Sequence, residues 1–309
     1  MEIFGSLLLL TLGFIMLVKG ADWFVDGASH IAQRFGIPQL VIGLTIVAMG
    51  TSAPEAAVSI TAALKGNADI TVGNIVGSNI LNILIILGIS SVITALAVSR
   101  STILYEIPFM IVITFVLFIQ GMSGVIVFSE GIILLLLFLA YLGYLFVMAK
   151  KGNAVDTDEK KKHKLWQSVL WTIAGLALII VGSNAAVDAA SSIARIFGMS
   201  ERFIGLTIVA LGTSLPELFT SVSAARKKNA DIAIGNIVGS NIFNILFVVG
   251  ISALITPIPF SAGFRIDTIF AAFAGILLLV CSVRRQKLHR KSGIIMLVSY
   301  MLYFVFICI

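Results

Sequence analysis

The chain has 309 residues, of which 59% are hydrophobic and only 12% are charged. A soluble globular domain carries about twice that share of charged residues, so the composition excludes an ordinary soluble protein. The formal net charge of +6 indicates basic loops at a membrane surface, and we expect no nucleic acid partner.

Long apolar stretches follow one another along the chain, separated by short polar breaks. Each is close to the length of about 20 residues that a helix needs to cross the hydrocarbon core of a bilayer. They predict ten spans, at 2–30, 39–64, 70–96, 103–120, 127–149, 165–194, 201–224, 231–257, 266–283 and 291–309. The predicted fold class is therefore an all-α polytopic membrane protein, with the lipid bilayer as its surroundings.

Basic residues are unevenly divided between the two sides that this threading defines. One side has 16 of the 21 Lys and Arg residues, and we call it the basic face. Its loops contain Arg34, Arg100 and the segments 150–164, 226–228 and 284–291. By the positive-inside rule this face is cytoplasmic, so both termini are expected on the outer side of the cell membrane. The hydrophilic loop 150–164 is too short for a separate domain, and we interpret it as a cytoplasmic linker.

The dominant feature is an internal repeat. Residues 20–90 align with 182–252 without a gap, with 43 identities in 71 positions; "VIGLTIVAMGTSAPE" matches "FIGLTIVALGTSLPE", and "NADITVGNIVGSNILNIL" matches "NADIAIGNIVGSNIFNIL". The two halves, 1–149 and 165–309, each have five predicted spans, so the second half enters the membrane from the opposite face. Inverted repeats are typical of secondary transporters, which bind substrate near the midplane between the halves.

Two acidic residues, Glu55 and Glu217, fall in the middle of predicted spans, at equivalent repeat positions. A charge at that depth costs about 2.5–3.5 kcal/mol on insertion scales. No Lys or Arg of a neighbouring mid-span position is available to pair with them. A bound cation explains the pair better than the alternative, two protonated carboxyl groups that join helices.

Pro54 and Pro216 stand directly before these glutamates. A proline inside a helix has no N–H for the carbonyl four residues back, here that of Gly50 or Gly212. Unpaired carbonyls are tolerated in a membrane only where they line a cavity or meet a partner. The carbonyls of 48–51 and 210–213 are therefore candidate cation ligands, and more oxygens come from the hydroxyls of Thr51, Ser52, Thr213 and Ser214.

The following span of each half adds a polar stripe. Its residues are spaced i, i+4, i+8 and so share one face of a helix: Asn74, Ser78 and Asn82, and their equivalents Asn236, Ser240 and Asn244. We expect Asn82 and Asn244 to bind the cation. For Asn74, Asn236, Asn79 and Asn241, bonds between helices are at least as good an interpretation. Glycines at 73, 77, 235 and 239 permit close helix approach.

All of these candidate ligands are oxygen atoms, which argues against zinc, copper and other soft or borderline metals. Ca²⁺ takes six to eight oxygens, whereas Mg²⁺ demands a tighter octahedral geometry and fits a kinked site less well. Two carboxylates neutralise one Ca²⁺ or two monovalent ions. We expect no cofactor and no catalytic residue, so the chain is not predicted to be an enzyme.

The paired "GTSxPE" and "GNIVGSNIxN" blocks resemble the two α-repeats of the cation/calcium antiporter superfamily, most closely its prokaryotic sodium/calcium exchangers, over essentially the whole chain. The resemblance implies a secondary active antiporter that exchanges Na⁺ for Ca²⁺ by alternating access and that functions as a monomer. It also implies that spans one and six slide across the other eight. Such a cycle responds to membrane potential where it moves unequal charge.

The ion ligands that the resemblance implies are the side chains of Glu55, Glu217, Thr51, Thr213, Asn82, Asn244, Ser52, Ser214, Ser78 and Ser240, with the backbone carbonyls of Ala48 and Ala210. Potassium-dependent relatives carry Asp where this chain has Asn244, so Asn244 implies K⁺-independent transport. A Ca²⁺/H⁺ antiporter is the main alternative, because two buried glutamates can also exchange protons. A cation channel or a structural membrane protein explains the inverted repeat and the two glutamates less well.

One more acidic pair recurs in the repeat. Asp26 and Asp188 lie near the ends of spans one and six. We favour solvation or hydrogen bonding at the membrane interface over ion gating for both.

Overall fold

The computed structural model describes residues 2–151, 164–198 and 210–308. Eight of its helices are long and apolar enough to cross a membrane, and a ninth candidate span is a helix pair, Gln39–Thr51 and Ala53–Leu64, bent by 50°. These nine match nine of the ten predicted spans. The seventh, expected at 201–224, begins outside the described residues, and its described part is α11 (Ala210–Thr213) and α12 (Leu215–Arg226). Most of the loop 150–164 also lies outside them.

The first half of the chain is built from helices with short interruptions. Its elements are α1 (Glu2–Phe35), α2 (Gln39–Ile42), η1 (Gly43–Val47), α3 (Ala48–Thr51), α4 (Ala53–Leu64), α5 (Asp69–Leu81), η2 (Asn82–Leu87), α6 (Gly88–Ile93), β1 (Leu96–Ala97), η3 (Thr102–Glu106), α7 (Ile107–Gly121), β2 (Val125–Ile126) and α8 (Phe128–Lys151). The η segments are wider turns of π-helix, a feature that is often found at functional sites.

The second half repeats this order. After α9 (Leu165–Ile196), α11 and α12 come α13 (Ala230–Phe243), η6 (Asn244–Val249), α14 (Gly250–Ile255), β3 (Ile258–Pro259), α15 (Ala262–Val283), β4 (Lys287–Leu288) and α16 (Arg290–Cys308). The π-helical segments η2 and η6 begin at Asn82 and Asn244, which are equivalent repeat positions.

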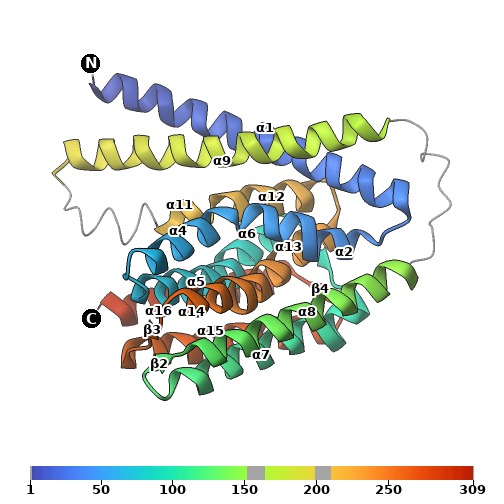
Figure 1. Ribbon diagram of the computed structural model, residues 1–309. Coiled ribbons are helices and arrows are strands. Elements are labelled where there is room, and N and C mark those ends of the chain that lie inside the picture. Colours follow the sequence, from blue (N-terminus) through green and yellow to red (C-terminus); the bar gives the residue numbers. More distant parts are fainter. Residues whose placement is uncertain (1, 152–163, 199–209, 309) are drawn as a thin grey trace.

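Helices α1 and α9, which begin the two halves, lie antiparallel along one side of the molecule (Figure 1). Their glycines meet in reverse order, since Gly13 lies against Gly182 and Gly20 against Gly175. A Cβ atom on Gly20 would come within 2.8 Å of the Gly175 carbonyl oxygen, so the two backbones approach too closely for any larger residue. Because equivalent helices run in opposite directions, the second half is inverted relative to the first.

The two short strand pairs follow the same symmetry. Leu96 pairs with Leu288 in one antiparallel pair, and Ile126 pairs with Ile258 in the other. Leu96 and Ile258 are equivalent repeat positions, and so are Ile126 and Leu288. The inverted relation therefore extends beyond the aligned motifs to the ends of the later spans, and confirms the predicted all-α polytopic fold of two inverted repeats.

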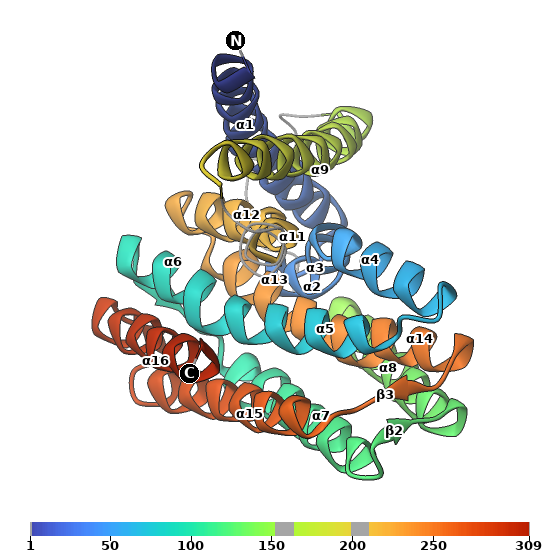
Figure 2. The ribbon, with the colours of Figure 1, turned by 90° about the vertical axis from the view of Figure 1, so that its left-hand side faces the viewer.

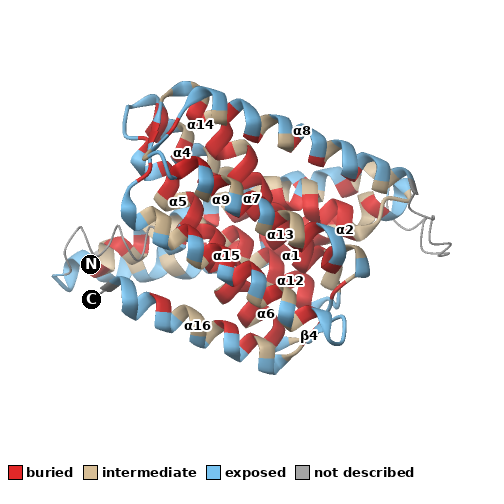
Figure 3. Ribbon diagram, turned by 90° about the horizontal axis from the view of Figure 1, so that it is seen from below, coloured by how far each residue is buried: buried red, intermediate tan, exposed pale blue. Residues whose placement is uncertain are grey.

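The centre of the molecule is formed by the helices that carry the "GNIVGSNIxN" blocks. In an apolar stretch of 18 residues within the span Ala230–Ile255, 83% of the residues are buried. In the outer span Arg290–Ile307 the buried share is 17%. Figure 3 shows the buried residues gathered around α13 and the exposed ones on outer helices such as α8 and α16. Viewed along the bundle, α1 and α9 lie at one edge and α7, α15 and α16 at the other (Figure 2). The apolar outer surface suits contact with lipid.

Candidate ion-binding site

Both "GTSxPE" segments break their helices at the serine. Ser52 separates α3 from α4 with φ −82° and ψ 7°, and Ser214 separates α11 from α12 with φ −92° and ψ 3°. The proline that follows two residues later cannot donate a backbone hydrogen bond, which explains why the helix ladder is interrupted here. At Ser52 the helices on the two sides of the break are bent by 50°, which agrees with the bend that the sequence predicts there.

The two carboxylates are bound across the halves. Ser52 Oγ donates a hydrogen bond of 2.7 Å to Glu217 Oε1, and Ser214 Oγ donates one of 3.2 Å to Glu55 Oε1. Both glutamates are completely buried. Each serine therefore serves the glutamate of the opposite repeat, and the two motifs form one cluster rather than two separate sites.

Four asparagines join the segment α5–η2 to the segment α13–η6. The side-chain nitrogens of Asn79 and Asn241 donate to each other's backbone carbonyls, at 3.2 and 3.1 Å. The side-chain oxygen of Asn241 accepts a hydrogen bond of 3.0 Å from Asn82 Nδ2, and that of Asn79 accepts one of 3.1 Å from Asn244 Nδ2. Asn79 and Asn241 thus bind the helices together, and the amide nitrogens of Asn82 and Asn244 are engaged.

Four buried oxygens of the cluster have no hydrogen-bond donor within the described residues: Glu55 Oε2, Glu217 Oε2, Asn82 Oδ1 and Asn244 Oδ1. They are two pairs of equivalent atoms. A buried acceptor without a partner costs about 1–3 kcal/mol, and more where the group is charged. No Lys, Arg or His in the described ranges pairs with either glutamate. Bound cations would satisfy such acceptors, two of which belong to carboxylates.

Serine hydroxyls connect the glutamates to the asparagine stripes. Ser214 Oγ lies 3.5 Å from Ser78 Oγ on α5, and Ser240 Oγ on α13 donates to the Ala48 carbonyl oxygen at 3.3 Å. The same carbonyl accepts from Ser52 N at 3.0 Å. Thr51 Oγ1 also lies 3.3 Å from it, and donates to Asn236 Oδ1 at the shorter distance of 3.0 Å. The Ala48 oxygen is therefore saturated in this arrangement, and a hydroxyl has to turn away before that carbonyl can bind an ion.

Two further serines, Ser59 and Ser221, belong to the site although the sequence motifs do not include them. Asn74 Nδ2 donates to Ser59 Oγ and Asn236 Nδ2 to Ser221 Oγ, both at 2.9 Å. The same amide nitrogens donate to the backbone carbonyls of Glu55 and Glu217, at 3.2 and 3.4 Å. These contacts fix the helical turn that carries each glutamate. Both serines stand four residues after the glutamate and are identical in the repeats, which is the signal that identifies them.

The structure thus brings together nine of the predicted ligand side chains, those of Thr51, Ser52, Glu55, Ser78, Asn82, Ser214, Glu217, Ser240 and Asn244. Thr213 is half-buried beside them. Ala210 is the first described residue after a gap, and the structure does not describe its side chain. The Gly212 carbonyl, expected to be free for a cation, accepts a hydrogen bond of 2.7 Å from Ser183 Oγ.

The surroundings of the site differ between the halves. Asn236 is fully buried, and a Cβ atom on Gly239 would come within 2.7 Å of the Leu44 carbonyl oxygen. The equivalent Asn74 is half-buried, and Gly77 is exposed with open space where a Cβ atom would be. Close approach at the glycines therefore holds for α13, as predicted, and not for Gly77 of α5. The repeat is symmetric in sequence but not in its packing.

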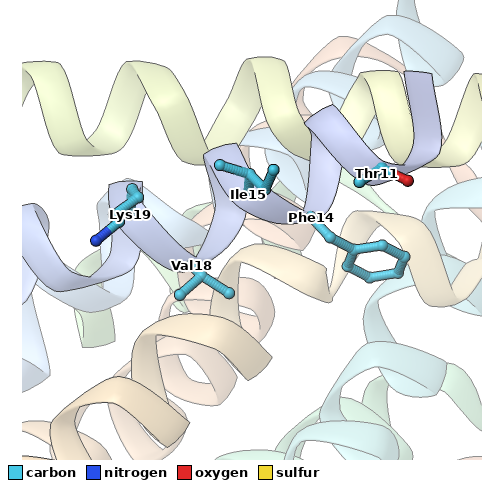
Figure 4. A pocket seen from close by; sticks show the side chains of 5 residues that line it. All are labelled: Thr11, Phe14, Ile15, Val18 and Lys19. Atoms are coloured by element: carbon cyan, nitrogen blue, oxygen red, sulfur yellow. The ribbon is translucent and has the colours of Figure 1, made fainter. Parts of the chain in front are cut away.

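A surface pocket lies apart from the site. Its lining comes from α1 alone and is mostly apolar: Thr11, Phe14, Ile15, Val18 and Lys19 (Figure 4). The Phe14 ring also contacts the Phe219 ring of α12, with 5.9 Å between centroids. None of the oxygen ligands lines this pocket. The site is instead a dense cluster in the interior, and no group of three or more His, Cys, Asp or Glu side chains occurs in the parts of the chain described.

Comparison with known proteins identifies the family of this chain. The family model for the sodium/calcium exchanger protein matches residues 5–147 and 167–309. The putative antiporter CaxA of Alkalimonas amylolytica is 41% identical over 303 residues, covering 94% of this chain and 95% of that protein. The sodium/calcium exchanger MaX1 of Methanosarcina acetivorans is 31% identical over 346 residues, covering 97% of each.

A solved structure shows the same fold. The sodium-calcium exchanger NCX_Mj, soaked with 10 mM Na⁺ and zero Ca²⁺, matches with a TM-score of 0.87 and 31% identity, over 98% of this chain and 99% of that one. The family model covers both halves, and the relatives are matched along nearly their whole length. This chain therefore belongs to the sodium/calcium exchanger family of multi-pass membrane antiporters.

Proposed function

We propose that this exchanger moves Na⁺ and Ca²⁺ in opposite directions by alternating access to the oxygen cluster between its two halves. The observation that carries the proposal is the set of four buried oxygens without donors, two of them on carboxylates. The charge of Ca²⁺ is balanced by two carboxylates, and its preference for many oxygen ligands is met by the neighbouring amides and hydroxyls. The names of MaX1 and NCX_Mj support the choice of ions.

The proposed ligands are those of the cluster. Glu55 and Glu217 hold the charge, and Asn82 and Asn244 present the oxygens that their own hydrogen bonds leave free. The remaining ligands are the hydroxyls of Thr51, Ser52, Ser78, Thr213, Ser214 and Ser240 and the carbonyls of Ala48 and Ala210. Because Ala48 is saturated by hydrogen bonds, we place its carbonyl in the ion-bound arrangement only.

We further propose that the cycle is electrogenic and independent of K⁺. Neutral oxygens outnumber the two carboxylates in the cluster, so more Na⁺ ions can bind than the carboxylates alone neutralise. A cycle that moves net charge gains or loses about 2.3 kcal/mol per elementary charge for every 100 mV. Independence of K⁺ rests on Asn244, which supplies no third negative charge.

The orientation that we propose follows the distribution of basic loops. The basic face is cytoplasmic, the termini are outside the cell membrane, and a single chain contains a complete site because both repeats contribute to it. Reciprocal bonds such as Ser52 to Glu217 support the monomer, since no second chain is needed to assemble the cluster.

The driving ion is tested by ⁴⁵Ca²⁺ uptake into proteoliposomes. Vesicles loaded with Na⁺ are diluted into choline medium, and parallel vesicles carry a pH gradient without Na⁺ or receive K⁺ as well. We expect uptake that requires internal Na⁺, is unchanged by K⁺ and rises when valinomycin sets an inside-positive potential. Uptake driven by the pH gradient and indifferent to Na⁺ would instead establish the Ca²⁺/H⁺ antiporter, and passive Ca²⁺ flux without either gradient would establish a channel.

A further inference from the structure

On the basic face, the end of α12 is fastened to α1 by Lys227. Its ammonium group lies 2.6 Å from Asp26 Oδ1 and donates to the Asp22 backbone carbonyl at 2.8 Å. One helical turn earlier, Ser223 Oγ donates a hydrogen bond of 2.6 Å to Asp22 Oδ1. Lys227 directly follows α12, the helix that carries Glu217. The contact therefore joins α1 to a helix of the ion site.

The repeat places a similar set of residues at the opposite face. Asp188 on α9 is the equivalent of Asp26, and Lys65, directly after α4, is the equivalent of Lys227. The hydrogen-bonding pair also has a counterpart: Thr61 stands for Ser223 and Asn184 for Asp22. Each face thus has one residue that can donate a hydrogen bond, one that can accept it, and one lysine with one aspartate.

Only one of the two sets is assembled. Asp188 and Lys65 are exposed, and neither forms an ion pair or hydrogen bond in the described part of the chain. Helix α1 packs against α12, whereas no comparable packing of α9 against α4 occurs among the described residues. The same asymmetry occurs close to the site, where Asn74 is half-buried and Gly77 exposed, whereas their equivalents Asn236 and Gly239 are buried.

A rigid connection exists between the two sets. Helices α1 and α9 are held together by backbone contacts at Gly13, Gly20 and Gly27, each too close for a side chain. A displacement of α1 away from α12 must therefore carry α9 with it. Because the halves are inverted, a shift that separates α1 from α12 on the basic face brings α9 toward α4 on the other.

We propose that Lys227 with Asp22 and Asp26, and Lys65 with Asp188, are two alternating latches, which close the basic face and the opposite face in turn. The first latch is formed in this structure and the second forms when the α1–α9 pair shifts. These residues position α1 and α9 and do not touch the transported ion. The inference rests on the alternating access of the proposed function. For Asp26 and Asp188 it favours a gating role over solvation or hydrogen bonding alone, which is the interpretation drawn from the sequence.

The size of the effect is limited by exposure. Side chains of Lys227, Asp22 and Asp26 remain 30%, 39% and 44% exposed, and ion pairs in such settings shift an equilibrium by roughly two- to fivefold. Removing one latch should therefore change the ratio of the two states by about that factor without abolishing exchange.

The test traps the second latch. In the full chain with Cys281→Ser and Cys308→Ser, the pair Asn184→Cys and Thr61→Cys reports closure of the face opposite the basic one through disulfide formation with a mild oxidant. We expect Lys227→Met to raise the rate of this cross-link about two- to fivefold and Lys65→Met to lower it. Lys228→Met, a charge removal at the next residue, should leave it unchanged. The exchange Lys227→Asp with Asp26→Lys should restore the original rate.

Three results would overturn the latches. These are no cross-link at any Na⁺ or Ca²⁺ concentration, equal effects of Lys227→Met and Lys228→Met on the cross-linking rate, or a change of that rate in the same direction in Lys227→Met and Lys65→Met. Cross-linking does not depend on which ion drives transport. Failure of Na⁺ to drive Ca²⁺ uptake, with the cross-linking pattern intact, would therefore reject the proposed ion and keep the latches.

Discussion

Ser52 Oγ lies 2.7 Å from Oε1 of Glu217, a residue 165 positions away in the opposite half of the chain. The reciprocal bond from Ser214 to Glu55 is 3.2 Å long. Each half thus supplies one carboxylate and the hydroxyl that orients the other half's carboxylate. Neither repeat can form the site alone, which gives a physical reason for the presence of both motifs.

Loss of either cross-half hydroxyl should weaken Ca²⁺ binding. Ser52→Ala removes a hydrogen bond to a carboxylate, and such a bond contributes about 1.5–3 kcal/mol. We expect the Ca²⁺ concentration for half-maximal exchange to rise about tenfold or more, measured as ⁴⁵Ca²⁺ uptake. Ser52→Thr keeps the hydroxyl and is the matched control. Equal concentrations for Ser52→Ala and the unaltered protein would show that this bond does not shape the site.

The asparagines that link α5 and α13 should act through orientation. Asn241→Ala removes the acceptor of Asn82 Nδ2 and the donor to the Asn79 carbonyl. The Asn82 amide then rotates freely and no longer aims its oxygen into the cluster. We expect a weaker apparent affinity for Ca²⁺ with the protein still folded, as judged by its circular dichroism. Asn67→Ala, at an exposed loop position, should change neither quantity; an equal loss in both variants would contradict the account.

Close packing of α1 on α9 should be sensitive to a single methyl group. A Cβ atom on Gly20 would lie 2.8 Å from the Gly175 carbonyl oxygen and 2.9 Å from Ile179 N. Overpacking of this kind costs about 1–3 kcal/mol, so Gly20→Ala should lower the unfolding temperature in detergent and slow exchange. Gly143→Ala on α8 has open space around the added methyl group. The unfolding temperature of this variant should stay the same or rise. An equal decrease in both variants would show that the effect does not come from the close packing of α1 on α9.

Asn244→Asp should change the choice of ions. The substitution adds a third carboxylate beside two that are already buried, and its charge repels them unless a further cation binds. We expect exchange that becomes stimulated by K⁺, with a lower maximal rate in its absence, measured as Na⁺-driven ⁴⁵Ca²⁺ uptake with and without K⁺. Asn236→Asp is a control at a residue that braces the glutamate turn. K⁺ stimulation in neither variant would show that Asn244 does not determine independence of K⁺.

Much of this architecture is predictable from the sequence because the repeat is so well preserved. Glu55 and Glu217 stand out as charges in apolar surroundings, and Pro54 and Pro216 predict the helix breaks that the structure shows. The odd number of spans in each half predicts the inversion. Those features depend on local chemistry and on counting, which a sequence provides directly.

Other features depend on how the two halves meet. The reciprocal bonds of Asn79 and Asn241 are set by the position of the symmetry axis, which no local pattern reveals. The pairing of Lys227 with Asp26 has an equally good counterpart in Lys65 and Asp188, so the sequence cannot tell which pair is assembled. Strands of two residues, such as β1 and β4, are too short to give a periodic pattern.

The role of Glu55 and Glu217 as the charged ion ligands is tested by Ca²⁺ exchange in variants of each. Glu55→Gln and Glu217→Gln each remove one charge from the cluster at nearly constant volume. Glu106→Gln is the matched control, since Glu106 is also buried but its carboxylate accepts a hydrogen bond from Tyr144, away from the cluster. In Na⁺-loaded proteoliposomes we predict that ⁴⁵Ca²⁺ uptake is abolished in both cluster variants and retained in Glu106→Gln. Uptake that persists in Glu55→Gln and Glu217→Gln would contradict the assignment of the site.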